Sequence, residues 1–397
     1  MNIAIISDAF PPQRTSASVH IRDLATEILV QGYKPIVVVP APGLSRKWEV
    51  EESRGIQIIR VKTMKMKDVG YFRRTLAEAL MPFIIMSRLY QSGKTQEKWG
   101  AVIWYSPTIF FGPLIHYLKR IHRCPTYLIL RDVFPEWAVD MGLMRRGLVY
   151  RTFKVVEYFQ YIAADTIGIQ SETARPYMSE LLKSRSIKVK LLRSWCSDIE
   201  KSYCSINIAE TRLNGRKICV YTGNMGVAQD VSIFLDLATI LRNRNDIGFL
   251  FVGRGSEVGH LKSIAETEQL DNVLFHDEIE PDEIFGLLKQ CHVGLVALDP
   301  RHTTSNIPGK FITYLQSALP VLACVNEDNE IISIIEENRL GHVSGKRDVE
   351  VISGKLLTLL KSETERQYIG QRCRSTFEDM FSSSNAVRQI LHEVLRE

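Results

Sequence analysis

The chain has 397 residues, which is too long for one ordinary hydrophobic core and predicts two domains. Its composition, 45% hydrophobic and 24% charged, is that of a soluble globular protein, and no apolar run reaches the roughly 18 residues of a membrane span. The first strand is expected to begin at Asn2, so we expect no signal peptide. The seven cysteines show no CxxC or Cys/His ligand spacing, which favours reduced core thiols in a cytoplasmic protein.

The net charge of +5 conceals an asymmetry between the two halves of the chain. Residues 1–200 carry 29 Lys or Arg against 18 Asp or Glu, whereas residues 201–397 carry 21 against 27. The first half therefore has a charge of +11 and the second a charge of −6. A basic half predicts an anionic partner, and nucleic acid and an anionic membrane surface are the two general candidates.

Uninterrupted apolar runs predict parallel strands in the first half. Residues 2–7 form such a run, apolar residues then recur at helical spacing up to Gly32, and Ile36–Val39 is a second run. Continuous Val/Ile runs are typical of a parallel sheet that is covered on both faces. Further strands are predicted at 56–61, 102–105, 127–130, 166–169 and 188–192. Residues 1–200 are therefore predicted to form a doubly wound α/β domain.

Residues 60–94 combine eight Lys or Arg with two Asp or Glu and many large apolar side chains. This pattern favours a helix that lies on an anionic lipid surface. The alternative is a core helix with a solvated basic face. Aromatic side chains among basic ones could also stack on single-stranded nucleic acid. Because no recognisable nucleic-acid module accompanies them, we expect no nucleic-acid partner.

The periodic pattern lapses between about Ser197 and Arg216, which predicts a linker, and then restarts. Strands are predicted at 218–221, 248–252, 273–275, 293–298 and 320–325, with helices at 228–242, at 256–268, from Pro281 and from Pro308. This is a second doubly wound domain, assigned to residues 201–380. The closing segment, 381–397, is expected to be a capped amphipathic helix that can pack back on the first domain.

A polar loop at 302–307 separates one predicted strand from the helix that starts at Pro308 and Gly309. Loops between the carboxyl end of a strand and the start of a helix are where α/β sheets bind ligands. The N–H groups at a helix start suit a phosphate, and Lys310 adds a cation there. The plain alternative is an ordinary connection with a surface lysine. Glycine-rich turns also follow two other strands, at 222–226 and 253–255, and three such turns in one domain favour a nucleotide ligand.

Several motifs together resemble glycosyltransferase family 4, whose GT-B architecture has two Rossmann-like domains facing across a cleft. They include the segments IISDAFPPQ, YTGNMGVAQDVSIFLDLA, FLFVGRGSEVGHLKSIAE and IPGKFITYLQSALPVLA. The sequences Leu130–Pro135, Gly223–Gly226 and Pro308–Lys310 further resemble the subgroup of N-acetyl-L-fucosamine transferases of bacterial surface-polysaccharide assembly.

The chain departs from the family pattern at several positions. The two glycines usual in the first loop are replaced by the segment 15–18, and the usual His-Asp pair is Arg131-Asp132. The common Arg and Lys that hold the donor diphosphate fall on Asn224 and Gln229. The paired glutamates of the family fall near Ser305 and Thr313, so both carboxylates are missing. Lys310 is then expected to supply the cationic contact to the diphosphate.

The resemblance implies a retaining transferase that moves a sugar from a UDP-sugar, expected to be an N-acetylated one, to an undecaprenyl-diphosphate-linked glycan of O-antigen or capsule biosynthesis. Such an enzyme would be cytoplasmic and peripheral on the inner face of the membrane. Asp132 and Lys310 are the expected catalytic residues. We expect no cofactor and no metal, because no DxD motif occurs. The expected donor-binding residues are Gly223, Asn224, Gln229, Gly253, Arg254, Ile279, Asn306, Ile307, Pro308, Gly309, Thr313 and Tyr314. On the acceptor side we expect Ser16, Ser18, His20, Arg131 and Glu136.

Alternatives remain at the levels of residue and function. Asp132 could instead cap the helix that begins near Pro135 and Glu136. A UDP-sugar 2-epimerase of the same fold would need carboxylates that face the donor sugar and would have no acceptor. The two missing glutamates are also compatible with a non-catalytic, membrane-associated partner subunit, which would bind nucleotide without turnover.

Overall fold

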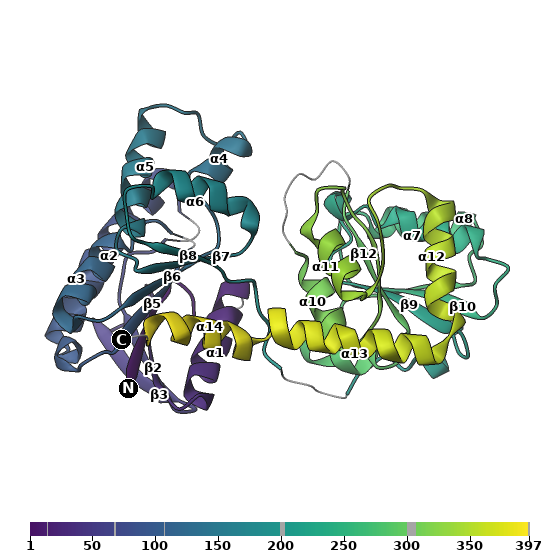
Figure 1. Cartoon of the computed structure of the whole chain (residues 1–397), viewed down its shortest axis with the longest axis horizontal. Coiled ribbons are helices and arrows are strands. Elements are labelled where there is room, and N and C mark those ends of the chain that lie inside the picture. Colours follow the sequence, from purple (N-terminus) through teal and green to yellow (C-terminus); the bar gives the residue numbers. More distant parts are fainter. Residues whose placement is uncertain (14, 67–68, 107, 199–202, 300–306, 396–397) are drawn as a thin grey trace. The chain divides into compact units, whose positions relative to one another are not determined.

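The computed structural model describes residues 1–13, 15–66, 69–106, 108–198, 203–299 and 307–395. The chain divides into two units (Figure 1). The first unit contains Met1–Ser197 together with Ser383–Glu397, and the second contains Asp198–Ser382. Each unit is an α/β domain built on a largely parallel sheet, as the apolar runs predict.

Within the described residues, the sheet of the first unit has eight strands in the order β3-β4-β2-β1-β5-β6-β7-β8. Among the strands described, β3 is the one that pairs antiparallel, along β4 at the edge of the sheet. The strands are β1 (Asn2–Ile6), β2 (Lys34–Pro40), β3 (Trp48–Ser53), β4 (Ile56–Val61), β5 (Ala101–Ser106), β6 (Thr126–Leu130), β7 (Thr166–Ile169) and β8 (Lys188–Leu191). The central strands are buried on both faces, which is why their sequences are continuously apolar.

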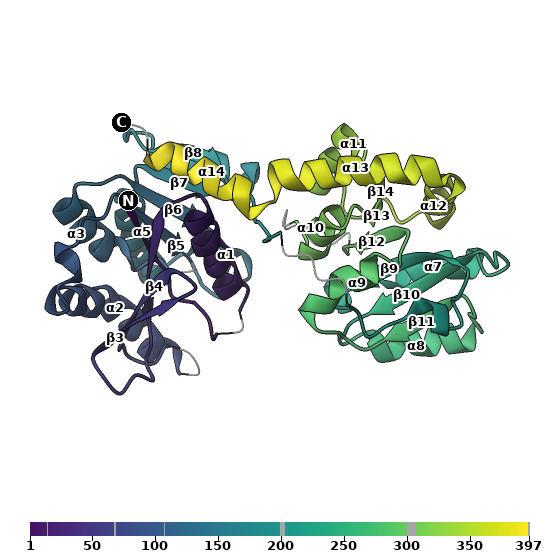
Figure 2. The same cartoon turned by 90° about the horizontal axis from the view of Figure 1, so that it is seen from below.

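Helices cover both faces of this sheet. One face carries α1 (Ser16–Val30) and α14 (Ser383–Val394), whose apolar residues share a core with β1 and β2. The other face carries α2 (Tyr71–Gln91), α3 (Gly112–His122), α5 (Leu148–Tyr161) and α6 (Arg175–Leu181). The short helix α4 (Glu136–Asp140) precedes α5. In the turned view of Figure 2, α14 lies along the edge of this unit where β7 and β8 are drawn.

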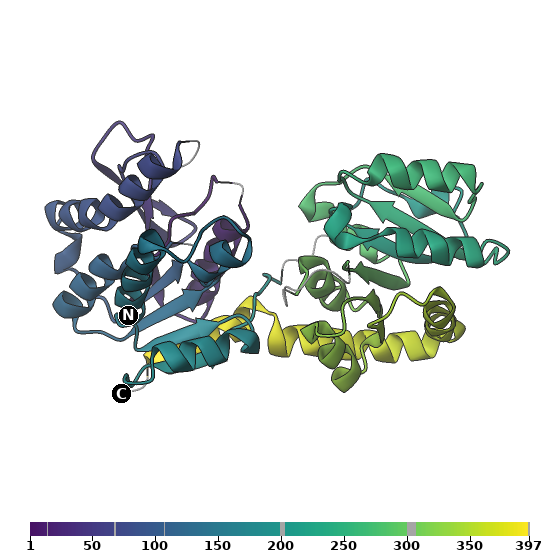
Figure 3. The same ribbon diagram turned by 90° about the horizontal axis from the view of Figure 1, so that it is seen from above.

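The sheet of the second unit has six parallel strands among the residues described, in the order β11-β10-β9-β12-β13-β14. Figure 3 shows the ribbon of this unit, in green, from the side opposite to that of Figure 2. They are β9 (Lys217–Thr222), β10 (Ile247–Val252), β11 (Val273–His276), β12 (Val293–Ala297), β13 (Val321–Cys324) and β14 (Gly341–Ser344). Its helices are α7 (Ser232–Ile240), α8 (Val258–Thr267), α9 (Ile284–Leu288), α10 (Gly309–Gln316), α11 (Glu330–Asn338), α12 (Val349–Lys361) and α13 (Glu363–Met380). Short 3-10 helices occur at Lys94–Gln96, Glu172–Ala174, Ile208–Glu210, Val227–Gln229 and Pro281–Glu283.

Local signals fix several helix starts. Thr15 accepts a hydrogen bond from the N–H of Ser18 at the start of α1, at 3.2 Å. Asn329, Asp348 and Ser362 cap α11, α12 and α13 in the same way. The predicted helix 228–242 is shorter than expected, because a 3-10 turn at Val227–Gln229 precedes α7 and places Asp230 at a φ of 44° between the two.

Candidate functional site

The strand order of the second unit changes direction between β9 and β12. Open α/β sheets bind ligands at the carboxyl edge beside such a reversal. The loop 222–226 follows β9 there, and α10 begins soon after β12. The buried hydroxyl of Tyr314 joins the two elements, because it accepts a hydrogen bond from the N–H of Thr222 at 3.0 Å and donates to the carbonyl of Val220 at 3.3 Å. Tyr314 therefore positions α10 on β9.

Lys310, in the first turn of α10, lies over the ring of Tyr221, with Nζ 3.4 Å from the ring centroid. The amine is buried, and among the described residues it has no hydrogen-bond partner. Burial lowers the pKa of Lys310 to about 7. Its Cε lies 3.9 Å from where a Cβ at Gly223 would be. A buried amine with no acceptor beside a strand-end loop is a site where an anion would stabilise the charged form.

The loops after β9 and β10 pack tightly against each other through two glycines. A Cβ at Gly253, whose φ is 149°, would lie 2.0 Å from the carbonyl oxygen of Gly223. A Cβ at Gly255 would lie 2.2 Å from the carbonyl oxygen of Met225. The absence of a Cβ at Gly253 and Gly255 therefore allows the two loops to approach each other closely.

Two of the predicted donor-binding residues offer no free main-chain N–H group to a diphosphate. The N–H of Gly223 donates to the carbonyl of Val252 at 2.8 Å, which continues the sheet pairing. Pro308 caps α10 and, as a proline, has no N–H to donate. Gly223 and Pro308 remain predicted donor-binding residues, but their own main-chain N–H groups are not available for that contact. Gly309 and Lys310, in the first turn of α10, retain backbone N–H groups without an intrahelical partner.

Asn224 and Gln229, which stand where the family has cations, bond to each other. The amide of Asn224 donates to Oε1 of Gln229 at 2.7 Å, and the N–H of Gly226 donates to the same oxygen at 3.1 Å. Arg254, in the next loop, is 79% exposed and pairs with Glu278 at 3.0 Å. The cation that the structure places beside Tyr221 and Gly223 is Lys310.

The remaining predicted donor residues lie around the same edge of the sheet or outside the described residues. Ile279 is half-buried in the loop after β11, and Ile307 is half-buried just before α10. The hydroxyl of Thr313 donates to the carbonyl of Gly309 at 3.1 Å, within α10. Asn306 lies outside the described residues.

In the first unit, the strand order changes direction between β1 and β5, and two of the predicted acceptor-side residues meet there. Nδ1 of His20 lies 3.4 Å from the hydroxyl of Tyr105, and its ring packs against Trp195. Arg131 lies over the ring of Tyr105 and donates to the hydroxyl of Ser194 at 2.7 Å. Burial and the charge of Arg131 lower the pKa of His20 to about 4, so its imidazole is neutral at physiological pH.

The other four predicted residues of this unit are placed differently. Ser16 is exposed in the first turn of α1, whereas Ser18 is buried. Asp132 is exposed after β6, and α4 has no side-chain cap at its start, so Asp132 does not cap that helix. Glu136 accepts a hydrogen bond from Tyr150 at 2.7 Å and pairs with Lys154 at 3.1 Å. Glu136 thus ties α4 to α5 and is engaged within the fold.

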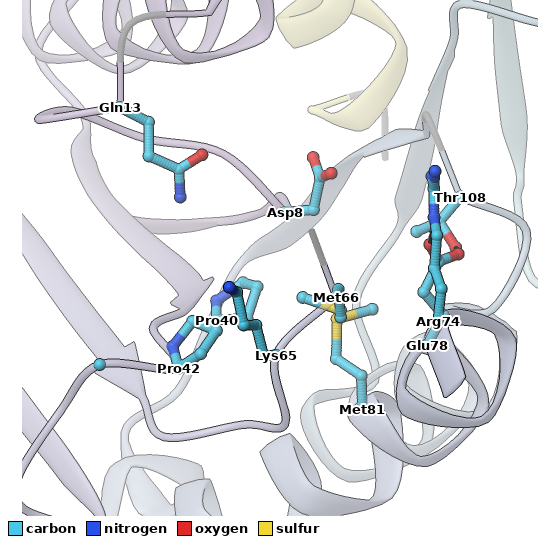
Figure 4. Close-up of a pocket in the computed structure, with 11 residues that line it drawn as sticks. Asp8, Gln13, Pro40, Pro42, Lys65, Met66, Arg74, Glu78, Met81 and Thr108 are labelled. Atoms are coloured by element: carbon cyan, nitrogen blue, oxygen red, sulfur yellow. Dashed lines mark hydrogen bonds and ion pairs between the residues drawn. The ribbon is translucent and has the colours of Figure 1, made fainter. Parts of the chain in front are cut away.

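A pocket of about 430 Å³ opens at the same edge of the first sheet (Figure 4). Its carboxylates and cations are Asp8, Glu78, Lys65 and Arg74, and Glu78 is held by Nε of Arg74 at 2.7 Å and by the hydroxyl of Thr108 at 3.0 Å. The rest of its lining is mostly apolar: Pro40, Pro42, Gly43, Met66 and Met81, with Gln13. Sequence reasoning missed this pocket. Polar residues soon after β1, β4 and β5, namely Asp8, Lys65 and Thr108, were the signal that could have indicated it.

All seven cysteine thiols are free, and burial raises the pKa of those that are most enclosed, for example that of Cys373 to about 12. Among the described residues, no three His, Cys, Asp or Glu side chains gather as metal ligands. In the same part of the chain, no helix combines the length and the apolar character needed to cross a bilayer.

A family model described as Glycosyl transferases group 1 matches residues 206–376, which lie within the second unit. The two Rossmann-like units make the GT-B fold of glycosyltransferases. Within that fold, the residues that resemble group 1 glycosyl transferases are those of the second unit.

Two curated relatives bear names of the same kind. The probable glycosyltransferase WbjE of Pseudomonas aeruginosa is 26% identical over 222 residues, which cover 54% of each chain. The aligned region thus spans about half the length of WbjE. The putative colanic acid biosynthesis glycosyl transferase WcaI of Escherichia coli K12 is 21% identical over 74% of this chain and 76% of its own. The description of the family model and the names of both relatives agree in referring to glycosyltransferases.

Solved structures agree along the whole chain. HepE from Anabaena in complex with UDP has a TM-score of 0.64 at 12% identity and is covered over 99% of both chains. WaaG, a glycosyltransferase involved in lipopolysaccharide biosynthesis, has a TM-score of 0.59 at 13% identity over 100% of both chains. At these identities the likeness shows the fold alone.

Proposed function

We propose that the protein is a retaining glycosyltransferase that moves a sugar from a UDP-sugar to a lipid-diphosphate-linked glycan during the assembly of a bacterial surface polysaccharide. The observation that carries the proposal is the buried amine of Lys310 over Tyr221 and beside Gly223, inside a group 1 glycosyl transferase domain. An uncompensated buried cation at the switch point of a sheet fits a diphosphate better than any neutral ligand.

The comparisons support a nucleotide-sugar donor and a polysaccharide product. The HepE structure is described as a complex with UDP, and WcaI is named for colanic acid biosynthesis. We propose UDP as the nucleotide and an N-acetylated hexose as the donor sugar, on the resemblance of Leu130–Pro135 and Pro308–Lys310 to the N-acetyl-L-fucosamine transferases.

In the proposed reaction, the bond between C1 of the donor sugar and the diphosphate oxygen breaks, and a bond from C1 to an acceptor hydroxyl oxygen forms on the same face. The acceptor proton passes to the diphosphate, and UDP leaves. Lys310 neutralises the charge that develops on the leaving diphosphate, with the N–H groups of Gly309 and Lys310 as further donors. Asp132, exposed at the end of β6, is proposed to orient the sugar or the acceptor.

We place the acceptor sugar in the pocket of the first unit. Carboxylates accept hydrogen bonds from sugar hydroxyls, and Met66, Met81 and the two prolines offer apolar surface to the C–H face of a sugar ring. Two carboxylates and two cations leave the pocket with no net charge, which suits a glycosyl unit better than a phosphate. The first unit as a whole is basic, as an acceptor on a lipid diphosphate requires.

Replacing Glu78 by glutamine should raise the KM for the acceptor by about tenfold, because a carboxylate bonded to sugar hydroxyls contributes roughly 1.5 kcal/mol more than an amide. The kcat and the affinity for UDP should stay unchanged. Glu51→Gln is the matched control, since Glu51 is also paired with an arginine, Arg60, at 2.7 Å but does not line the pocket. Equal acceptor KM values for the two variants would remove Glu78 from the acceptor site.

We also propose that α2 contacts an anionic membrane at the cytoplasmic face. The helix buries Ala77, Met81, Ile85 and Leu89 in the core, so it is a core element, yet it also leaves an apolar stripe exposed at Phe72, Leu76, Leu80, Phe83 and Tyr90. Lys62, Lys65, Arg73 and Arg74 lie near its start. From the sequence, residues 60–94 were interpreted either as a helix on a lipid surface or as a core helix with a solvated basic face. The helix α2 instead has one buried apolar face and one exposed apolar face. Co-sedimentation with anionic vesicles measures this attachment.

The proposed function is tested by offering a panel of UDP-sugars with a lipid-diphosphate acceptor and identifying the products by mass spectrometry. We expect one sugar to be added with retained anomeric configuration. Because no metal is expected, turnover should persist in excess EDTA. Loss of turnover that Mg²⁺ or Mn²⁺ restores would contradict the metal-free mechanism. Epimerised UDP-sugar without an extended acceptor would point to the epimerase, and UDP binding without any product to a non-catalytic subunit.

A further inference from the structure

The segment from α4 to the start of α5 exposes large apolar side chains at several neighbouring positions. Met141 is 69% exposed, Leu143 70% and Leu148 81%, and Trp137 and Val149 are also exposed. In Figure 1 the connection between α4 and α5 stands out from the rest of the first unit. Soluble proteins rarely expose so many large apolar residues within one short segment without a partner.

Hydrogen bonds and ion pairs to neighbouring helices fix the position of this segment. Glu136 of α4 bonds to Tyr150 and Lys154 of α5, and Lys154 also pairs with the fully buried Glu157 at 2.6 Å. The hydroxyl of Tyr177, from α6, donates to Glu157 at 2.8 Å. The apolar side chains are thus presented by an anchored turn whose polar contacts face the core.

The charges around the apolar residues are mostly positive. The exposed residues Arg145, Arg146 and Arg151 lie within the segment, and Asp140 is its one exposed carboxylate. The contact of Arg146 with Glu136 is long, at 3.8 Å. Arginines that border exposed Leu, Met and Trp suit a surface of anionic headgroups above acyl chains.

The segment shares a side of the first unit with the start of α2. Both α2 and α5 cover the same face of the sheet, with α3 in contact with each. Because the strands that precede them are parallel, both helices begin at the carboxyl edge of the sheet. Tyr71 and Phe72, which start α2, are 89% and 85% exposed. Two exposed apolar sets, one at each helix start, thus lie at one edge.

We propose that residues 137–151 form a second lipid-contacting surface, which places Met141, Leu143 and Leu148 among the acyl chains of an anionic bilayer while its arginines contact the headgroups. The inference rests on the proposed function, since it places the sheet edge that carries the acceptor pocket at the membrane. Salt distinguishes the two kinds of contact within such a surface. Removing apolar residues should weaken binding at every salt concentration, whereas removing cations should weaken it chiefly at low salt, because charge attraction is screened.

Trp137 provides a direct probe of insertion. It is exposed, whereas Trp99, Trp104 and Trp195 are buried, so in a Trp48→Phe background it is the tryptophan that solvent reaches. On addition of phosphatidylglycerol vesicles its emission should shift to shorter wavelength and be quenched by lipids brominated on the acyl chain. Co-sedimentation without any change in Trp137 emission would overturn the proposal.

Variants separate this surface from α2 and from the reaction. Leu143→Ser with Leu148→Ser should lower vesicle affinity by at least about tenfold, since each leucine loses its burial in lipid. Ile240→Ser with Val351→Ser, at exposed apolar positions of the second unit, should change nothing. Lys62→Ser with Arg73→Ser should weaken binding chiefly at low salt.

The remaining outcomes also discriminate. Transfer to a short soluble acceptor should be unaffected by Leu143→Ser with Leu148→Ser, so a loss of that activity as well would refute a role confined to lipid. If sedimentation shows a dimer that these changes dissociate, the surface binds a second copy of the chain and the lipid proposal fails. A protein that transfers sugar but never binds vesicles would overturn both membrane contacts while leaving the transferase function standing.

Discussion

Replacing Lys310 by methionine should weaken the binding of UDP by roughly tenfold to a hundredfold at neutral pH, which corresponds to the ~1.5–3 kcal/mol of a hydrogen bond to a charged group. Methionine preserves most of the side-chain volume over Tyr221, so the loss of UDP affinity measures the contribution of the positive charge of Lys310. Calorimetric titration with UDP measures it. Unchanged affinity would remove Lys310 from the donor site and with it the observation on which the proposed function depends.

The pH dependence of the same titration gives a sharper result. The amine of Lys310 has a pKa of about 7 in the free protein and becomes neutral above it. A bound diphosphate favours the charged form, so binding at higher pH must take up a proton. The affinity of the parent should therefore fall with rising pH, by up to about tenfold per unit. Titration in buffers of different ionisation enthalpy should show proton uptake in the parent and not in Lys310→Met.

Lys310→Met should also stabilise the protein in the absence of UDP. The folded pKa of Lys310 is lowered from the ordinary value of 10.5, so the buried charge costs stability. That cost is fully present below about pH 7 and fades as the pH rises towards 10.5. We expect a gain on the order of a few kcal/mol at neutral pH. A gain in Tm that disappears in alkaline buffer would identify the cause.

Gly253→Ala should destabilise the protein by roughly 3 kcal/mol or more, because the new Cβ would meet the backbone of Gly223 and the left-handed φ would be strained. UDP binding should weaken too, since Gly223 lies beside Lys310. Gly259→Ala is the matched control: Gly259 lies within α8, no atom is within 4 Å of its Cβ position, and alanine favours the helix by up to about 1 kcal/mol. Urea unfolding measures both. Similar midpoints would show that the two loops can separate at little cost.

The strands and their parallel arrangement could be predicted because burial on both faces leaves a direct trace in the sequence. The start of α10 was predictable for a similar reason, since proline and glycine mark the place where a strand-end loop becomes a helix. The edge strands β3 and β14 were both missed, and β3 shows why. Its sequence, Trp-Glu-Val-Glu-Glu-Ser, is largely exposed and charged, so it has no apolar run, and only its pairing with β4 makes it a strand.

The details of the site depended on contacts between distant segments, which periodicity does not record. Whether the N–H of Gly223 is free depends on Val252 in the neighbouring strand. The burial of Lys310 depends on the ring of Tyr221, which belongs to β9. The pocket around Glu78 needs four separate loops and one helix. Residue type and position suggested Lys310, but only packing distinguishes a buried amine from an ordinary surface lysine.

The position of α14 in the sequence has a consequence for how the first unit folds during synthesis. Val387, Ile390 and Leu391 of α14 complete the core beneath β1 and β2, and the N–H of Ser383 bonds to the carbonyl of Cys196 where the chain first leaves that unit. The second unit is thus an insertion within the first. On the ribosome, the sheet of the first unit emerges early with α1 on one of its faces, but the part of that face on which α14 packs stays uncovered until residues 383–394 are translated. The second unit is continuous in sequence, so all of it is translated before α14. Translation of the first unit therefore begins first, but the second unit can complete its fold first.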